Sequence, residues 1–262
     1  MERKRGGCRY NKKGQLTIFI ILGILILIVL IFLFSRTDFI ETFFVAEKAP
    51  IEQIKDCMLE PVKEGIEILS LQGGSINPEN YYLYKDNKVE YVCYTEENLK
   101  PCVMQKPILK NSIEEELKTY AQPKIRNCMN NVKESLEGKG YAVSMKPAEV
   151  NVEIVPDNVL VDVNISLSIS KERTETYNTL RTGIRSKIYN SVMIASSIMA
   201  FETRYGDSET LNYMLYYPSI KVEKKKQGEG SKIYIITDRD TEEKFMFAIR
   251  SVVIPPGVIE IR

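Results

Sequence analysis

The sequence contains no histidine and no tryptophan. Histidine is the commonest general base in enzymes and the commonest metal ligand in proteins. Its absence excludes Ser-His-Asp and Cys-His catalysis within this chain. An enzyme with this composition would have to use carboxylates, for instance an Asp/Glu pair in a hydrolase. Close acids such as Glu114, Glu115 and Glu116 fall mostly on an exposed predicted helix. We therefore predict no catalytic residue, no cofactor and no metal site.

Cysteine is scarce, and no two cysteines have the CxxC spacing that is typical of zinc sites. Cys8 lies in a basic N-terminal head, and four more follow an apolar segment: Cys57, Cys93, Cys102 and Cys128. Four cysteines in an exported domain favour two disulfides, with three possible connectivities. We favour Cys93–Cys102, which closes a short turn, and Cys57–Cys128, which joins two helices. A four-thiolate zinc site is the alternative.

Charge is missing altogether from residues 16–34, which read LTIFIILGILILIVLIFLF. As a helix these nineteen residues extend roughly 28 Å, which matches the hydrocarbon core of a bilayer. A helix on the surface of a soluble protein carries a polar stripe, and this segment has none. The sequence therefore predicts a transmembrane helix over residues 15–35.

The charges around this segment are unevenly distributed. Residues 1–14 hold six basic residues and one acid, which leaves 30 basic and 34 acidic residues in the remainder. Basic flanks stay on the cytoplasmic side of a membrane. We therefore predict a single-pass membrane protein with a cytoplasmic N-terminus and an extracellular C-terminal domain. Beside a membrane segment, the basic head is more simply a topology signal than a nucleic-acid site, so the predicted partner is the lipid bilayer.

The junction Asn11-Lys12-Lys13-Gly14-Gln15-Leu16-Thr17 precedes the apolar run. It resembles the class III signal peptide of archaeal type IV pilins and archaellins. The resemblance implies that a prepilin peptidase cuts between Gly14 and Gln15. It also implies that the apolar segment stays attached as an anchor and packs against other pilin-like subunits in a filament.

Two features qualify what this resemblance implies. Type IV pilins usually carry glutamate at the fifth mature position, where this chain has Phe19. This departure argues against filament assembly more than against processing. The head and apolar run also resemble those of uncharacterised one-span surface proteins of archaea. An ordinary uncleaved signal anchor is the alternative to pilin-type processing.

Beyond the predicted membrane helix, the periodicity predicts an α+β ectodomain with helices first and an antiparallel sheet later. After a juxtamembrane segment, residues 36–48, we expect a helical part over 49–146 and a sheet-rich part over 147–262. The expected helices cover residues 51–71, 112–138, where Ser112 and Glu115 form a capping box, and 177–205. The expected strands are a hairpin over 150–154 and 159–169, followed by 216–224, 232–237 and 244–253.

Residues 77–105 are predicted to be rich in loops and hold a cluster of tyrosines: Tyr81, Tyr82, Tyr84, Tyr91 and Tyr94. Tyrosine offers a large amphipathic contact area, so this segment is a candidate binding loop for sugar or protein. The alternative is that the rings cover the edge of a core. The acidic turn at 238–243 is predicted to be solvated, with calcium binding as the alternative. Asn164 lies in a glycosylation sequon.

These observations favour a non-enzymatic, membrane-anchored surface protein of the pilin-like class, either a minor filament subunit or an adhesin. Two alternatives remain open at this point. One is a membrane-tethered, carboxylate-based hydrolase. The other is a receptor or assembly partner that uses the tyrosine-rich loop.

Overall fold

The computed structural model describes residues 13–34, 48–146 and 149–251. The chain divides into two compact units, Met1–Lys48 and Ala49–Arg262, which are described separately. The leader up to residue 12, with Cys8, lies outside the described residues, as do 35–47 of the predicted juxtamembrane segment.

The described part of the first unit is one helix, α1 (Lys13–Phe34). Its described side chains belong to residues 19–29, Ile31 and Phe32, and all of them are exposed. Apart from Gly23 they are large and apolar, so these positions form no polar face. In the parts of the chain that are described, no helix meets the combined length and apolarity needed to cross a membrane.

The second unit confirms the predicted α+β class: four described helices pack against two sheets. The helices are α3 (Pro50–Leu71), α4 (Leu109–Gly138), α5 (Ile188–Tyr205) and α6 (Thr210–Tyr216). The first sheet contains β1 (Tyr81–Tyr84), β2 (Asn87–Tyr94), β3 (Val103–Met104), β8 (Ile220–Lys226), β9 (Ser231–Asp238) and β10 (Lys244–Arg250). The second sheet contains β4 (Ala142–Met145), β5 (Glu149–Val155), β6 (Asn158–Ser170) and β7 (Thr174–Arg185).

The first sheet has the order β1-β2-β10-β9-β8, with β3 paired to β2. All of its pairs are antiparallel except β2–β10, which is parallel. In the second sheet β6 is central: β5 and β4 pair with successive halves of one edge, and β7 pairs with the other edge. Alternate residues of β5 and β6 are buried, as the predicted hairpin requires.

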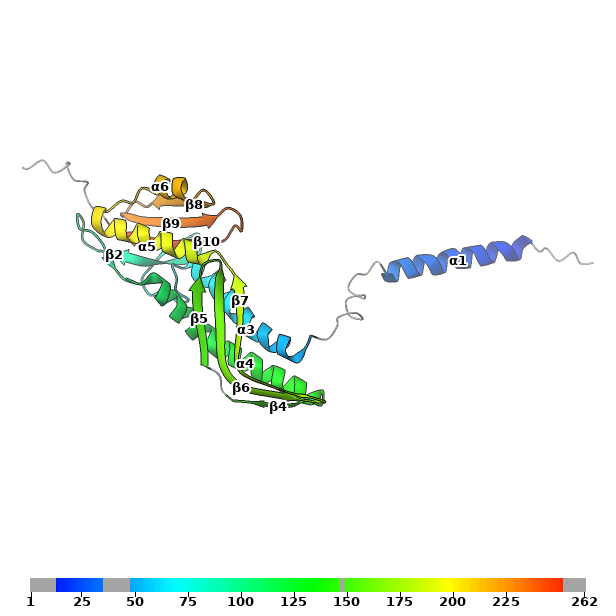
Figure 1. Cartoon of the computed structure of the whole chain (residues 1–262). Helices are drawn as coiled ribbons and strands as arrows, with labels where there is room; N and C mark the ends of the chain where they lie inside the picture. The colour runs from blue at the N-terminus through cyan, green and yellow to red at the C-terminus, as the bar shows by residue number, and fades with distance from the viewer. Residues whose placement is uncertain (1–12, 35–47, 147–148, 252–262) are drawn as a thin grey trace, which may run out of the picture. The chain divides into compact units, whose positions relative to one another are not determined.

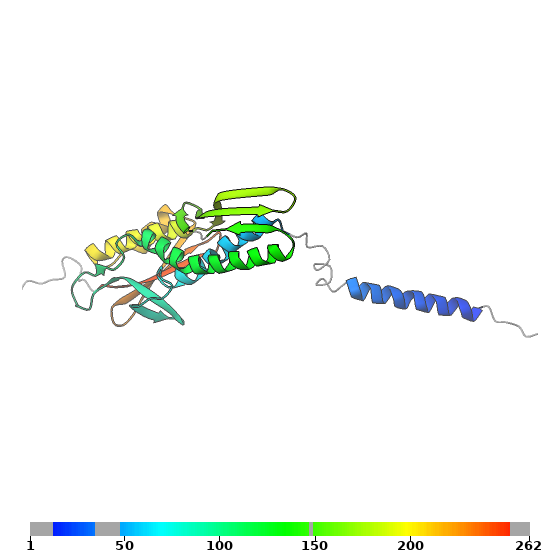
Figure 2. The ribbon, with the colours of Figure 1, turned by 90° about the horizontal axis from the view of Figure 1, so that it is seen from below.

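The helices cover one face of each sheet. Figure 1 shows α5 along β9 and β10, and α3 and α4 along the sheet of β5, β6 and β7. Figure 2 shows α3 and α4 side by side. The buried apolar residues of both helices belong to one core cluster. These contacts place the larger apolar cluster of the second unit between the helices and the two sheets.

Both predicted disulfides are confirmed. Cys57 of α3 bonds to Cys128 of α4, with the Cα atoms 5.5 Å apart, and joins the two helices. Cys93 of β2 bonds to Cys102, with a Cα separation of 5.4 Å. A zinc site at these four cysteines is therefore excluded in this structure, because their sulfurs are bonded in two separate pairs.

The prediction of a helix over 177–205 was wrong in its first part. Residues up to Arg185 form strand β7, and α5 begins only at Ile188. Leu180 and Ile184, which suggested a helical stripe, are four residues apart, a spacing that fits both a helix and a strand. Pairing with the long strand β6 decides between the two periods.

The prediction that 77–105 is rich in loops was wrong in part, because β1, β2 and β3 occupy 14 of these 29 residues. The predicted capping box at Ser112 is absent as well. Helix α4 starts at Leu109, its N-cap is Ile108, and the Ser112 hydroxyl donates to the Ile108 carbonyl instead.

The two disulfides close loops of very different length, with sequence separations of 71 and 9 residues. On the chain-entropy estimate, replacing Cys57 and Cys128 by alanine should lower the free energy of unfolding by about 4 kcal/mol. The same change at Cys93 and Cys102 should cost about 2.5 kcal/mol. Urea unfolding followed by circular dichroism measures both. A larger loss of stability on removing Cys93–Cys102 than on removing Cys57–Cys128 would contradict loop closure as the source of the stability.

Candidate functional site

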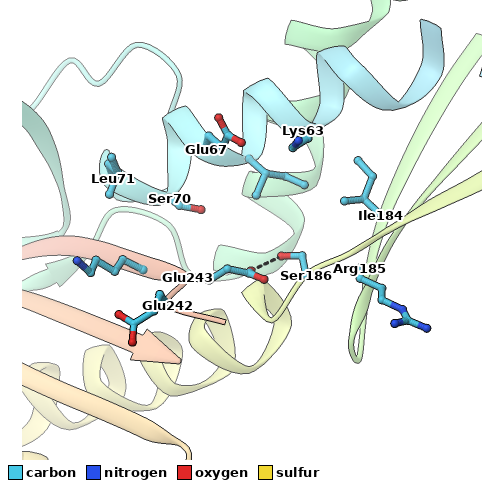
Figure 3. A pocket seen from close by; sticks show the side chains of 11 residues that line it. Lys63, Glu67, Ser70, Leu71, Ile184, Arg185, Ser186, Glu242 and Glu243 are labelled. Atoms are coloured by element: carbon cyan, nitrogen blue, oxygen red, sulfur yellow. Dashed lines mark hydrogen bonds between the residues drawn. The ribbon is translucent and has the colours of Figure 1, made fainter. Parts of the chain in front are cut away.

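A pocket of about 380 Å³ lies between α3, the end of β7 and the β9–β10 turn (Figure 3). Its volume falls in the range of small-molecule sites. Apolar side chains of Ile66, Leu71 and Ile184 line part of it. The remaining residues are polar or charged: Lys63, Glu67, Ser70, Arg185, Ser186, Glu242, Glu243 and Lys244. Six of these eight carry charges, three of each sign.

The Glu243 carboxylate spans the pocket edge and ends at the start of α5. It accepts hydrogen bonds from the Ser186 hydroxyl (2.7 Å) and from the Lys187 backbone N–H (2.9 Å). The Ser186 hydroxyl oxygen in turn accepts from the Ile188 backbone N–H (3.2 Å). A carboxylate and a hydroxyl therefore satisfy N–H groups that the first turn of a helix leaves without partners. The role of Glu243 is therefore structural, because its carboxylate is bound to the residues that begin α5.

The acids of this pocket do not converge. In Figure 3 the carboxylates of Glu67 and Glu242 point away from one another, and Glu243 is turned toward Ser186. A carboxylate-based hydrolase needs two acids that face a common substrate atom. The pocket has the size to hold a small ligand but lacks this arrangement.

The rest of the acidic turn is also used by the fold. Asp238 is buried, and its Oδ1 atom accepts from the Asp240 N–H (3.1 Å), the Thr241 N–H (3.0 Å) and the Thr241 hydroxyl (3.1 Å). Residues 239–242 of the turn are exposed, as the predicted solvated turn requires, and Asp238 is the buried exception. No group of three or more metal-ligating side chains occurs among the described residues.

A second polar cluster is buried at the end of α5, and the sequence analysis did not predict it. Glu202 forms an ion pair with Lys232 of β9, with Oε2 and Nζ 2.7 Å apart. Its Oε1 atom accepts from the Tyr234 hydroxyl and from the Ser208 backbone N–H. Lys232 also donates to the carbonyl of Gly206, which ends α5. Glu202, Lys232 and Tyr234 are 0%, 7% and 0% exposed, so these bonds are made away from water.

The pKa of Tyr234 and the pKa of Asp207 are both shifted at this cluster. Burial raises the pKa of the Tyr234 hydroxyl, and the nearby charge of Glu202 raises it further. Tyr234 therefore remains a hydrogen-bond donor. At Asp207 the largest single effect is burial, which raises the pKa of the carboxyl. The Lys224 hydrogen bond and the Lys232 charge oppose burial, and the pKa is lowered overall. The cluster holds α5 on β9 through paired charges, which is a structural arrangement.

The predicted tyrosine loop is a strand hairpin. Tyr81, Tyr82 and Tyr84 lie in β1, and Tyr91 and Tyr94 lie in β2. The Tyr91 hydroxyl is 2.7 Å from the Ser231 hydroxyl. Burial raises the pKa of the Tyr91 hydroxyl. Rings of Tyr82, Tyr84, Tyr91 and Tyr94 pack with a second apolar cluster on the sheet: Val89, Ile233, Met246 and Ala248. The rings therefore cover a sheet face, which was the alternative interpretation of this cluster.

Other candidate residues have separate locations. Gly14 and Gln15 fall in the first turn of α1, and the Gln15 side chain lies outside the described set. Glu114 accepts from the Ile154 N–H of β5 (2.7 Å), and Glu116 accepts from the Ile76 N–H (3.2 Å). These two acids bind backbone instead of facing solvent, so their predicted exposure was wrong. Asn164 is exposed on β6.

Comparison of the chain with protein-family models, with curated proteins and with solved structures found no match.

The role of Glu243 predicts a specific loss of stability. Replacing Glu243 by glutamine should lower the free energy of unfolding by about 1–2 kcal/mol, because a neutral amide is a weaker acceptor for the start of α5. The matched control is Glu242→Gln, the same change one residue earlier, which should stay within about 0.5 kcal/mol. Equal losses in the two variants would show that Glu243 does not cap α5.

The buried ion pair predicts non-additive effects. Lys232→Met should cost about 3–5 kcal/mol, because it leaves the Glu202 carboxylate buried without its counter-charge. Adding Glu202→Gln, which keeps an oxygen acceptor for Tyr234, should restore most of that loss. Thermal unfolding of the single and double variants measures the coupling. If the loss of stability in the double variant equalled the sum of the losses in the two single variants, the predicted coupling between Glu202 and Lys232 would be refuted.

Proposed function

We propose that this chain is a membrane-anchored, surface-displayed, non-enzymatic protein of the pilin-like class, a minor filament subunit or an adhesin. In this proposal residues 16–34 lie in the bilayer, and the disulfide-braced second unit lies outside the cell. The observation that carries the proposal is the composition of residues 16–34, which contain no charge and no polar stripe.

The described side chains of α1 support the proposal. From Phe19 to Val29 the large apolar side chains of α1 are 47% to 71% exposed, so the helix by itself does not bury them. Contact with water would be unfavourable for all of these groups. Seventeen large apolar residues in a lipid environment contribute on the order of 5–10 kcal/mol toward insertion.

Two further observations support the orientation. The six basic residues before the apolar run favour a cytoplasmic N-terminus. The two disulfides of the second unit suit an oxidising, extracellular compartment. The processing partner in this proposal is a prepilin peptidase that acts between Gly14 and Gln15. Phe19 favours an anchor or minor subunit over a polymerising one, and other pilin-like subunits remain possible partners.

The geometry gives less support to the alternatives. A hydrolase would need converging acids, and the acids around the α3–β7 pocket point apart or cap α5. A receptor working through the tyrosine cluster would need free rings, and most of these rings pack on the first sheet.

Cell fractionation tests the membrane anchor. The full-length chain should sediment with membranes and resist extraction by alkaline carbonate. Replacing Leu25 and Ile26 together by lysine should move the chain to the soluble fraction, because each central lysine costs about 2.5–3.5 kcal/mol in a bilayer. The control is Leu215→Lys on α6, an exposed apolar position of the second unit, which should stay with membranes. An unaltered chain in the soluble fraction would refute the proposal.

Mass spectrometry of the purified chain tests the pilin-like part separately. A mature chain that begins at Gln15 is the expected result. A membrane-bound chain that begins at Met1 would leave the anchor in place but would overturn the pilin-like assignment.

A further inference from the structure

A groove of about 350 Å³ lies where α5, α6 and the segment that leads into β8 meet. Helix α5 contacts β9 and β10, and α6 contacts β8 of the same sheet (Figure 1). The residues that line it come from α5, from α6 and from the segment that leads into β8: Tyr189, Asn190, Met193, Ile194, Ser197, Tyr213, Tyr217, Ser219 and Ile220. None of the nine side chains carries a charge, in a protein whose residues are 27% charged. The α3–β7 pocket, with six charged side chains, has the opposite character.

The tyrosines give this groove aromatic walls. The Tyr213 hydroxyl lies 2.9 Å from the Ser197 hydroxyl, which fixes that ring between α6 and α5. Tyr217 is 54% exposed and Met193 is 38% exposed, so apolar surface is open to a ligand at this place. No hydrogen bond to the Tyr189 hydroxyl, the Tyr217 hydroxyl or the Asn190 amide is made by the part of the chain that the structure describes. Donors and acceptors are therefore available beside the rings.

These features select a class of ligand. An anionic or cationic ligand would find no counter-charge in the groove. A purely aliphatic ligand, which has no hydrogen-bonding groups, would cover the polar groups of Asn190 and Tyr217 without pairing them, which costs free energy. A pyranose ring matches both properties, because its faces carry C–H groups that pack on aromatic rings and its edge carries uncharged hydroxyls. The volume also lies in the range of small-ligand sites.

We propose that the groove between α5 and α6 binds a neutral oligosaccharide. Tyr217 and Tyr189 provide the stacking surfaces, and the Asn190 amide donates to and accepts from sugar hydroxyls. The inference depends on the chemistry of this groove and not on the membrane anchor, so either proposal can fail alone.

Direct binding to the full-length chain tests the inference. The protein is purified in a detergent without a sugar headgroup, such as an amine oxide, so that the detergent does not occupy the groove. Neutral hexasaccharides of glucose, mannose, galactose and N-acetylglucosamine are compared with sulfated oligosaccharides on an array, and the best ligand is titrated by calorimetry. A neutral oligosaccharide is expected to bind, with no preference for the sulfated probes.

Variants locate the binding. Tyr217→Ala should weaken the affinity by about tenfold, the loss expected for one stacking ring, and Asn190→Ala by about threefold to tenfold. The matched control is Tyr216→Ala, which removes an adjacent ring that is 82% exposed and does not line the groove. It should leave the affinity unchanged. Circular dichroism confirms that all three variants fold.

Four results would overturn the inference. They are no binding of any neutral probe at about 10 mM, a preference for sulfated probes, an equal effect of Tyr216→Ala and Tyr217→Ala, and a dimer in light scattering that Tyr217→Ala dissociates. The last result would assign the groove to contact between two copies of the chain.

Discussion

The parallel pairing of β2 with β10 is the constraint on which the second unit depends. It places Tyr91 beside Ala248, residues from distant parts of the sequence, and so puts β10 between β2 and β9. Parallel neighbours cannot be joined by a tight hairpin. The intervening chain must therefore leave the first sheet and return to it, and on this excursion it forms α4, the second sheet and α5. The helices then cover the sheets on the side where the chain crosses.

Carboxylates make several of the connections between these elements. Glu114 joins α4 to β5, Glu116 joins α4 to the segment after α3, Glu243 joins the β9–β10 turn to α5, and Glu202 joins α5 to β9. In each case a charged acceptor binds a backbone N–H or a buried cation, which is stronger than a neutral hydrogen bond. Acids fixed in this way stabilise the fold by joining elements that are distant in the sequence.

Charge is absent from two places with different geometry. Residues 18–34 of α1 are all uncharged and apolar, which suits lipid. In the α5–α6 groove uncharged side chains include hydroxyl and amide groups, which suits a neutral polar ligand. An anchored protein with an exposed sugar site would have the properties of an adhesin, and the two features could then serve one role.

The sequence by itself determined the features that depend on local pattern. The uncharged run at 16–34, helices α3 and α4 and the β5–β6 hairpin follow from period and composition over neighbouring residues. The pairing of Cys93 with Cys102 and of Cys57 with Cys128 followed from one short turn and two amphipathic helices.

The tertiary structure decided whatever depends on partners far away in the chain. Strand β7 is a strand because β6 pairs with it, although the spacing of Leu180 and Ile184 also fits a helix. The Glu202–Lys232 pair arises because α5 packs on β9, 30 residues further along the chain. The α5–α6 groove depends on how these consecutive helices are placed on the sheet. Local periodicity reports which face of an element is apolar but not which element will cover it, and that choice follows from packing the whole unit.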